Sequence, residues 1–149
     1  MAATPAVSTY SQNSDMPETG QVFSYAQITD LHIGRGEGDY GTPGFDDAPP
    51  SGDVGLPAQN LRSTVDWINA NQGSMPIEFV VVTGDIADSA EKSEFMKAKE
   101  ILDTLVVPYI PIPGNHDMWP YTASAECNEP CGDQYFKEIF ASEFETLRS

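Results

Sequence analysis

Three short apolar runs, each ending in polar residues, constrain the fold of this 149-residue chain most strongly. The runs span residues 22–29, 77–83 and 106–112; the first alternates loosely, and the middle one is almost entirely apolar and β-branched. Unbroken apolar runs of this length are typical of parallel strands that are covered on both faces. The runs therefore predict three strands of a mainly parallel sheet.

Helical patterns separate and follow these runs. One lies between residues 57 and 73 with Trp67 on its flank, a second lies within 89–105, and an amphipathic stretch at 134–147 predicts a third helix. The apolar stripes of the first two consist of Leu61, Val65 and Ile68, and of Phe95, Ala98, Leu102 and Leu105. Residues 34–56 are rich in Gly, Pro and Asp and are expected to form a long surface loop. The resulting order β-α-β-α-β-α predicts an α/β fold with right-handed crossovers.

Each predicted strand runs into side chains of the kinds that bind metal ions. They are Asp30 and His32 after the first strand, Asp85 after the second, and Asn115, His116 and Asp117 after the third. In open α/β sheets, ligands bind beyond the carboxyl ends of the strands. Carboxylate, imidazole and amide groups suit Mn, Fe or Zn. Singly, each residue has an ordinary alternative as a turn, capping or loop residue, but their joint placement favours a metal site.

These motifs resemble those of the calcineurin-like metallophosphoesterase superfamily. The resemblance rests on Asp30-x-His32, Gly84-Asp85 and the Gly-Asn-His-Asp run at residues 114–117, and it extends over about 22–119. It implies that the chain forms the amino-terminal half of an α/β/β/α sandwich. It also implies that one divalent ion binds Asp30 and His32, that Asp85 bridges two ions, and that Asn115 holds the second. His116 would then act on the phosphate, with Asp117 orienting its ring.

The activity implied by the resemblance is hydrolysis of a small phosphomonoester or phosphodiester. A hydroxide activated by two divalent ions (Mn, Fe or Zn) would attack phosphorus. The family's protein phosphatases carry an Asp-Arg-Gly element after the bridging Asp, whereas here Asp85 is followed by Ile-Ala-Asp-Ser-Ala. The sequence is more similar to the cyclic-nucleotide phosphodiesterase-like branch. Asp88 is a residue that supports the metal ligands, or else Asp88 or Ser89 caps the second helix.

The family's site is completed by later histidines, but this chain has only two, and both are already assigned. We therefore expect a flexible lead-in at residues 1–20 and a metallophosphoesterase domain at 21–149 that is truncated at its carboxyl end. Such a chain would bind metal weakly and hydrolyse phosphoesters poorly. The alternative is a non-catalytic remnant of the fold that acts as a binding module. A phospho-aspartate phosphatase is disfavoured, because position 32 is His rather than a second Asp.

The formal net charge of −16 argues against direct binding to nucleic acid or anionic lipid. It would also repel phosphate esters unless bound cations reverse the local charge.

The sequence contains neither a membrane-spanning apolar run nor an intact signal peptide, and it leaves the compartment open. Cys127 and Cys131 would form a local disulfide if the protein is exported and remain thiols otherwise. Trp119 and Tyr121 either line a substrate pocket or pack internally.

Overall fold

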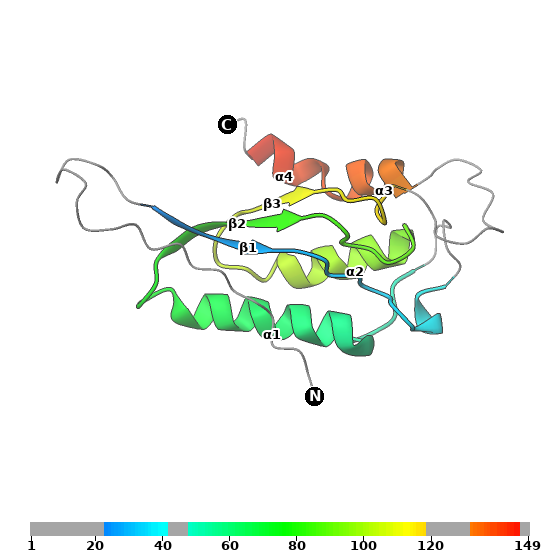
Figure 1. Ribbon diagram of the computed structural model, residues 1–149, viewed down its shortest axis with the longest axis horizontal. Coiled ribbons are helices and arrows are strands. Elements are labelled where there is room, and N and C mark those ends of the chain that lie inside the picture. Colours follow the sequence, from blue (N-terminus) through cyan, green and yellow to red (C-terminus); the bar gives the residue numbers. More distant parts are fainter. Residues whose placement is uncertain (1–22, 42–47, 119–131, 147–149) are drawn as a thin grey trace.

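The computed structural model describes residues 23–41, 48–118 and 132–146, and Figure 1 shows their arrangement. The strands are β1 (Ser24–Ile28), β2 (Ile77–Thr83) and β3 (Tyr109–Ile112). The helices are α1 (Gly55–Asn71), α2 (Lys92–Leu102), α3 (Gly132–Ile139) and α4 (Ala141–Thr146), with a 3₁₀ turn, η1, at Gly38–Tyr40. The described helices include none that is both long and apolar enough to cross a bilayer.

The three strands form one parallel sheet in the order β1-β2-β3. Ala26 pairs with Val80, which in turn pairs with Tyr109. The alternation of strands and helices confirms the predicted α/β class. Because the strands are parallel, all three carboxyl ends meet at one edge of the sheet.

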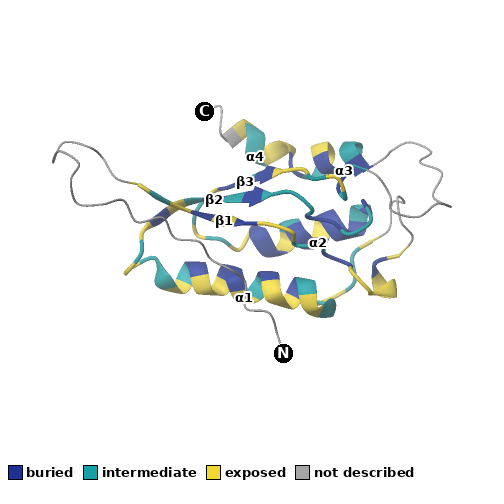
Figure 2. Ribbon diagram, viewed as in Figure 1, coloured by how far each residue is buried: buried dark blue, intermediate teal, exposed yellow. Residues whose placement is uncertain are grey.

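The core lies between one face of the sheet and the helices. Val80 and Val82 of β2 are fully buried and join one apolar cluster with Val65 and Ile68 of α1 and Phe95 of α2. Figure 2 shows the buried positions of α1 turned toward the sheet and its exposed positions turned away. The helical stripes predicted from the sequence are therefore the faces that build this core.

The opposite face of the sheet is only partly covered in the described part of the chain. Tyr25 is 48% exposed and Ile112 is 45% exposed, and burial alternates along β1. The expectation that the strands are covered on both faces is therefore wrong for these residues. Tyr25 stacks on Phe79 across β1 and β2, with ring centroids 5.4 Å apart.

Pro111 fits into β3 because of the direction in which its nitrogen points. Val80 N–H donates to Pro108 O and Gly84 N–H donates to Ile112 O, so the even-numbered peptide groups of β3 face β2. The nitrogen of Pro111 therefore faces the outer side of the strand, where β2 requires no donor. A proline in the strand thus removes no hydrogen bond between β2 and β3.

The helix ends depart from the sequence prediction for local reasons. α1 begins at Gly55, and Pro57 sits in its first turn, where its missing N–H has no intrahelical partner to lose. The expected single last helix is two helices, α3 and α4, separated at Phe140. Phe140 is fully buried and its ring lies 5.1 Å from that of Phe136. Phe140 N–H still donates to Phe136 O at 3.0 Å, so the chain stays close to helical across the boundary.

The loop between β1 and α1 contributes to the core, contrary to expectation. Tyr40 is 1% exposed, its hydroxyl donates to Val54 O at 3.0 Å, and Ser93 Oγ donates to Tyr40 O at 2.5 Å. The loop therefore includes an anchored segment that packs against the start of α2.

Candidate metal centre

The loops that follow β1 and β2 run side by side beyond the carboxyl edge of the sheet. Asp30 N–H donates to Gly84 O at 3.2 Å, and His32 N–H donates to Asp85 O at 2.8 Å. A short parallel bridge joins Ile33 to Ala87. The predicted ligands are thus held by a backbone ladder that prolongs the sheet.

The loop after β3 approaches the loop after β2 very closely at two glycines. A Cβ on Gly114 would lie 2.2 Å from Asp85 Oδ1 and 2.4 Å from Asp85 N. A Cβ on Gly84 would lie 3.1 Å from Gly114 Cα, and Gly84 has a φ of +78°. Gly84 therefore serves both a turn and the close approach of the two loops, whereas Gly114 serves the close approach alone. His116 N–H completes the junction by donating to Asp85 Oδ1 at 3.1 Å.

Of the described non-glycine residues with a positive φ, all except Ala90 are predicted ligands. Asp30, His32 and Asp85 adopt φ values of +55°, +47° and +48°, in the left-handed region that side chains disfavour. Each such residue costs on the order of 1–3 kcal/mol and persists only where the surroundings fix it. Strain of this kind clusters at functional sites, so its location supports a functional role for these residues.

Asp30, His32 and Asp85 lie together. One potential ligand atom from each residue lies within 4.8 Å of those from the other two. Nε2 of His32 is 4.0 Å from Asp85 Oδ2, and the Thr29 hydroxyl lies 2.6 Å from Asp30 Oδ2. Two carboxylates and one imidazole are a donor set that suits Mn, Fe or Zn, so these residues fit the divalent ion that the sequence predicts.

Asp88 contacts both histidines of the site. Its Oδ1 accepts a hydrogen bond from His32 Nδ1 at 2.9 Å, and its carbonyl oxygen accepts one from His116 Nδ1 at 2.7 Å. The two imidazole rings meet edge to face, with centroids 4.7 Å apart. Both Nδ1 atoms therefore carry the proton, which leaves each Nε2 as the ligand or proton-exchanging atom.

Asp88 does not cap the second helix. The N-cap of α2 is Glu91, which forms a reciprocal capping box with Glu94. The alternative reading of Asp88 and Ser89 as helix caps is therefore wrong, and the contact of Asp88 with His32 agrees with a supporting role. The spacing of Asp88 from Asp85 gave no means of choosing between the two readings.

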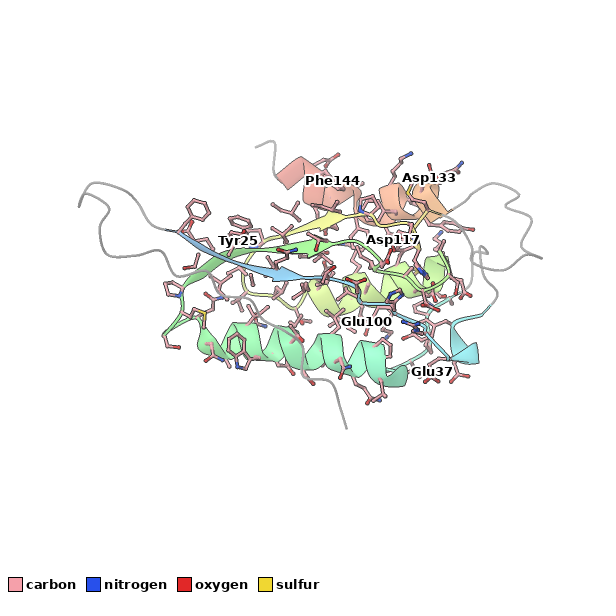
Figure 3. All side chains as sticks on the ribbon, viewed as in Figure 1. Tyr25, Glu37, Glu100, Asp117, Asp133 and Phe144 are labelled. Atoms are coloured by element: carbon pink, nitrogen blue, oxygen red, sulfur yellow. The ribbon has the colours of Figure 1, made fainter. Side chains whose placement is uncertain are left out.

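Asp117 has partners other than the expected His116 ring. Its carboxylate is fully buried and accepts hydrogen bonds from the N–H groups of Gly114 at 2.8 Å, Ile86 at 3.1 Å and Ala87 at 2.7 Å. Burial raises the pKa of Asp117 against the opposing effect of these donors. These contacts fasten the loop after β3 to the loop after β2. Figure 3 shows Asp117 and Tyr25 toward opposite ends of the sheet.

Of the remaining predicted site residues, only Asn115 lies in the described part of the chain. Asn115 is exposed in the turn that also carries His116 and Asp117, and Met118 N–H donates to its carbonyl at 3.2 Å. The proposed pocket residues Trp119 and Tyr121, and the cysteines Cys127 and Cys131, lie outside the described residues.

Glu94 holds the loop after β2 through hydrogen bonds to its backbone, and it was not identified from the sequence. It is 1% exposed and accepts hydrogen bonds from Ser89 N–H at 2.9 Å and Glu91 N–H at 3.2 Å. A Cβ on Gly34 would lie 2.1 Å from Glu94 Oε1, so Glu94 also contacts the loop after β1. Burial raises its pKa to about 8. The sequence gives little signal for it, because Glu91 is not one of the usual N-cap residues of a capping box.

Comparison with known proteins agrees with this geometry. The family model described as calcineurin-like phosphoesterase matches residues 23–147, which include every described element and all the predicted ligands. Among curated proteins, none matches the chain. The three-stranded parallel sheet with interleaved helices is consistent with the amino-terminal half of that fold. The chain therefore belongs to the calcineurin-like phosphoesterase family.

Proposed function

We propose that this protein hydrolyses phosphate esters with the help of divalent metal ions. The observation that carries the proposal is the convergence of Asp30, His32 and Asp85, whose ligand atoms lie within 4.8 Å of one another on left-handed backbone. The family match supports phosphoester chemistry in general. Asp30, His32 and Asp85 would hold one ion, and Asp85 and Asn115 would hold a second.

Divalent ions bound here would supply a hydroxide near neutral pH and polarise the phosphoryl oxygens. The chain itself would orient the reacting groups. His32 presents Nε2 toward Asp85 because Asp88 accepts from its Nδ1. Gly114 and Gly84 allow the second and third loops to approach closely enough to bring Asp85 and the 115–117 turn together.

His116 is the proposed proton donor to the leaving oxygen. Its Nδ1–H donates to the carbonyl of Asp88, so Nε2 is the atom that would exchange a proton with substrate. We propose that this backbone carbonyl, rather than the Asp117 carboxylate, orients the imidazole. Asp117 would act on the same turn indirectly, through Gly114.

The proposed substrate is a small phosphomonoester or phosphodiester. The run Val81-Val82-Thr83-Gly84-Asp85 is followed by Ile-Ala-Asp without the Asp-Arg-Gly element of the protein phosphatases. This supports the small-molecule, cyclic-nucleotide phosphodiesterase-like branch. The net charge of −16 disfavours nucleic-acid substrates. The family's site uses more histidines than the two in this chain, so we expect slow turnover.

Metal binding by matched variants tests the proposal. Titration calorimetry with Mn²⁺ should show binding to the parent chain, weaker binding to Asp85→Asn, and unchanged binding to Asp66→Asn, which makes the same change at an exposed site on α1. Hydrolysis of p-nitrophenyl phosphate and bis-p-nitrophenyl phosphate with Mn²⁺ then tests catalysis. Equal Mn²⁺ affinity for all three proteins would refute the ligand assignment. Binding without any turnover would favour the binding-module alternative.

A further inference from the structure

We infer that Arg35 is a phosphate-binding residue of this site and that it selects esters with a terminal phosphate over diesters. The inference rests on the proposed function, because it assigns a substrate class to the same site. Arg35 lies three residues after His32, in the loop that follows β1, and was not singled out from the sequence.

A tight turn holds Arg35 at the rim of the metal centre. Arg35 N–H donates to His32 O at 3.1 Å, and Glu37 N–H donates to Gly34 O at 2.9 Å. Gly34 and Gly36, on either side of Arg35, have φ values of +93° and +78°. Two left-handed glycines let the chain turn sharply here, so the Arg35 side chain leaves the turn next to the candidate ligands.

The guanidinium of Arg35 is close to the site but only loosely engaged. Its Nε lies 3.9 Å from Asp88 Oδ1, and its side chain is 65% exposed. The same Asp88 oxygen is already bonded to His32 Nδ1 at 2.9 Å. Among the described residues this ion pair is the only one from a Lys or Arg to a carboxylate of the site. An exposed ion pair of this length contributes little, so moving the guanidinium to a substrate costs little.

Arg35 is a cation at a site whose other charged groups are carboxylates. Asp30, Asp85 and Asp88 surround the site with carboxylates, in a chain with 7 Lys and Arg against 23 Asp and Glu. A cation that remains exposed here, without a close hydrogen bond from its side chain to another described residue, has donors to offer an incoming anion. Guanidinium matches phosphate because it presents parallel N–H donors to two oxygens at once.

The charge and the number of non-bridging oxygens on the phosphate determine how strongly Arg35 would contribute to binding an ester. A terminal phosphate carries between one and two negative charges at neutral pH and three non-bridging oxygens, whereas a diester carries one charge and two such oxygens. One added guanidinium therefore contributes more to binding a monoester. The family match by itself leaves the choice between monoester and diester open. The resemblance to the cyclic-nucleotide phosphodiesterase-like branch favours a diester, whereas Arg35 favours a monoester.

Phosphate binding to the Mn²⁺-loaded protein tests this inference without requiring turnover. Calorimetric titration should show inorganic phosphate binding about tenfold more weakly to Arg35→Gln than to the parent, because the variant loses a charge-assisted hydrogen bond to the anion. Arg35→Lys should be intermediate. Dimethyl phosphate, the diester probe, should lose less affinity on the same substitution than inorganic phosphate does, because it has less negative charge and one fewer non-bridging oxygen. Lys137→Gln is the control, because it removes the same charge from an exposed position on α3.

The outcomes separate this inference from the proposed function. Equal phosphate affinity for the parent and Arg35→Gln, with Mn²⁺ still bound by both, would overturn the role of Arg35 alone. An equal loss in Lys137→Gln would also overturn it, because the effect would then reflect net charge. A parallel loss of Mn²⁺ affinity in Arg35→Gln would show that Arg35 acts through Asp88 instead. Failure of the parent to bind Mn²⁺ would remove the proposed function and this inference with it.

Discussion

The imidazole of His32 donates from Nδ1 to Oδ1 of Asp88 across 2.9 Å, and this bond joins the loop after β1 to the loop after β2. The carbonyl of Asp88 meanwhile accepts from Nδ1 of His116. One residue thereby fixes the tautomers of both histidines. A carboxylate that accepts from the far nitrogen of a metal-binding imidazole orients the ring and raises its basicity.

Substitution of Asp88 should weaken metal binding although Asp88 is not among the proposed ligands. We expect Asp88→Ala to lower the Mn²⁺ affinity about 10- to 100-fold, the usual effect of losing such a partner. Asp88→Asn should lose less, because its amide oxygen can still accept from His32. Calorimetric titration with Mn²⁺ measures both, with Asp66→Ala as the exposed control. Parent-like affinity in Asp88→Ala would mean that the backbone alone orients His32.

Gly114→Ala should destabilise the protein and disrupt the site together. The added methyl would meet Asp85 Oδ1 at 2.2 Å and the Asp85 backbone nitrogen at 2.4 Å, and the backbone atom cannot move without displacing the loop. We expect a loss of about 1–3 kcal/mol in the free energy of unfolding, measured in urea. Gly73→Ala is the matched control, because a methyl group at that position would meet nothing within 4 Å. Similar stabilities for the two variants would contradict the close approach.

Much of this site could be predicted because its residues follow directly from strand ends. Apolar β-branched runs identify β2 with its correct bounds, and parallel pairing then brings Asp85 to the same edge as Asp30 and His32. The role of Asp117 could not be predicted in this way. The family resemblance implied that Asp117 orients the His116 ring, but its carboxylate accepts from backbone N–H groups instead. One is Gly114 on its own turn, and the other two are Ile86 and Ala87 on the loop after β2, 31 and 30 residues earlier in the chain.

Other features depended on contacts that no local pattern encodes. Tyr40 lies in a loop of Gly, Pro and Asp that gives no hydrophobic periodicity, yet it is buried against α2 through Ser93. Arg35 appears in the sequence as one more charged loop residue. Its relation to Asp88 arises only when the loops after β1 and β2 pair beyond the sheet.

The stability of the protein should fall as the pH rises from about 4.5 to about 8 because of Glu94. Burial raises its pKa from 4.5 to about 8, so between these values the folded state holds a proton that the unfolded state has released. The contribution is greatest below pH 4.5 and is lost as the pH passes 8, with a size on the order of a few kcal/mol.

Replacing Glu94 with Gln should remove this pH dependence. Urea unfolding of the parent and Glu94→Gln at about pH 5, 6, 7 and 8 should give free energies that diverge in the parent's favour at the acid end and converge or reverse at the alkaline end. Gln preserves the side-chain acceptor of the capping box. Glu78→Gln, an exposed change on β2, should run parallel to the parent. A constant difference between Glu94→Gln and the parent would show that Glu94 does not titrate differently on folding.

Asp117→Asn should separate loop stability from metal binding. Two opposing effects act at this position: burial disfavours the ionised carboxylate, and three backbone N–H donors favour it. The donors should decide the result, because an Asn side chain offers one oxygen and turns its own amide donors toward N–H groups that would then be unsatisfied. We expect a loss of about 1–3 kcal/mol in the free energy of unfolding measured in urea, with Mn²⁺ affinity of the folded protein reduced less than in Asp85→Asn. If Asp117→Asn instead kept the parent's stability and lost only turnover, Asp117 would serve His116 in catalysis rather than hold the loop.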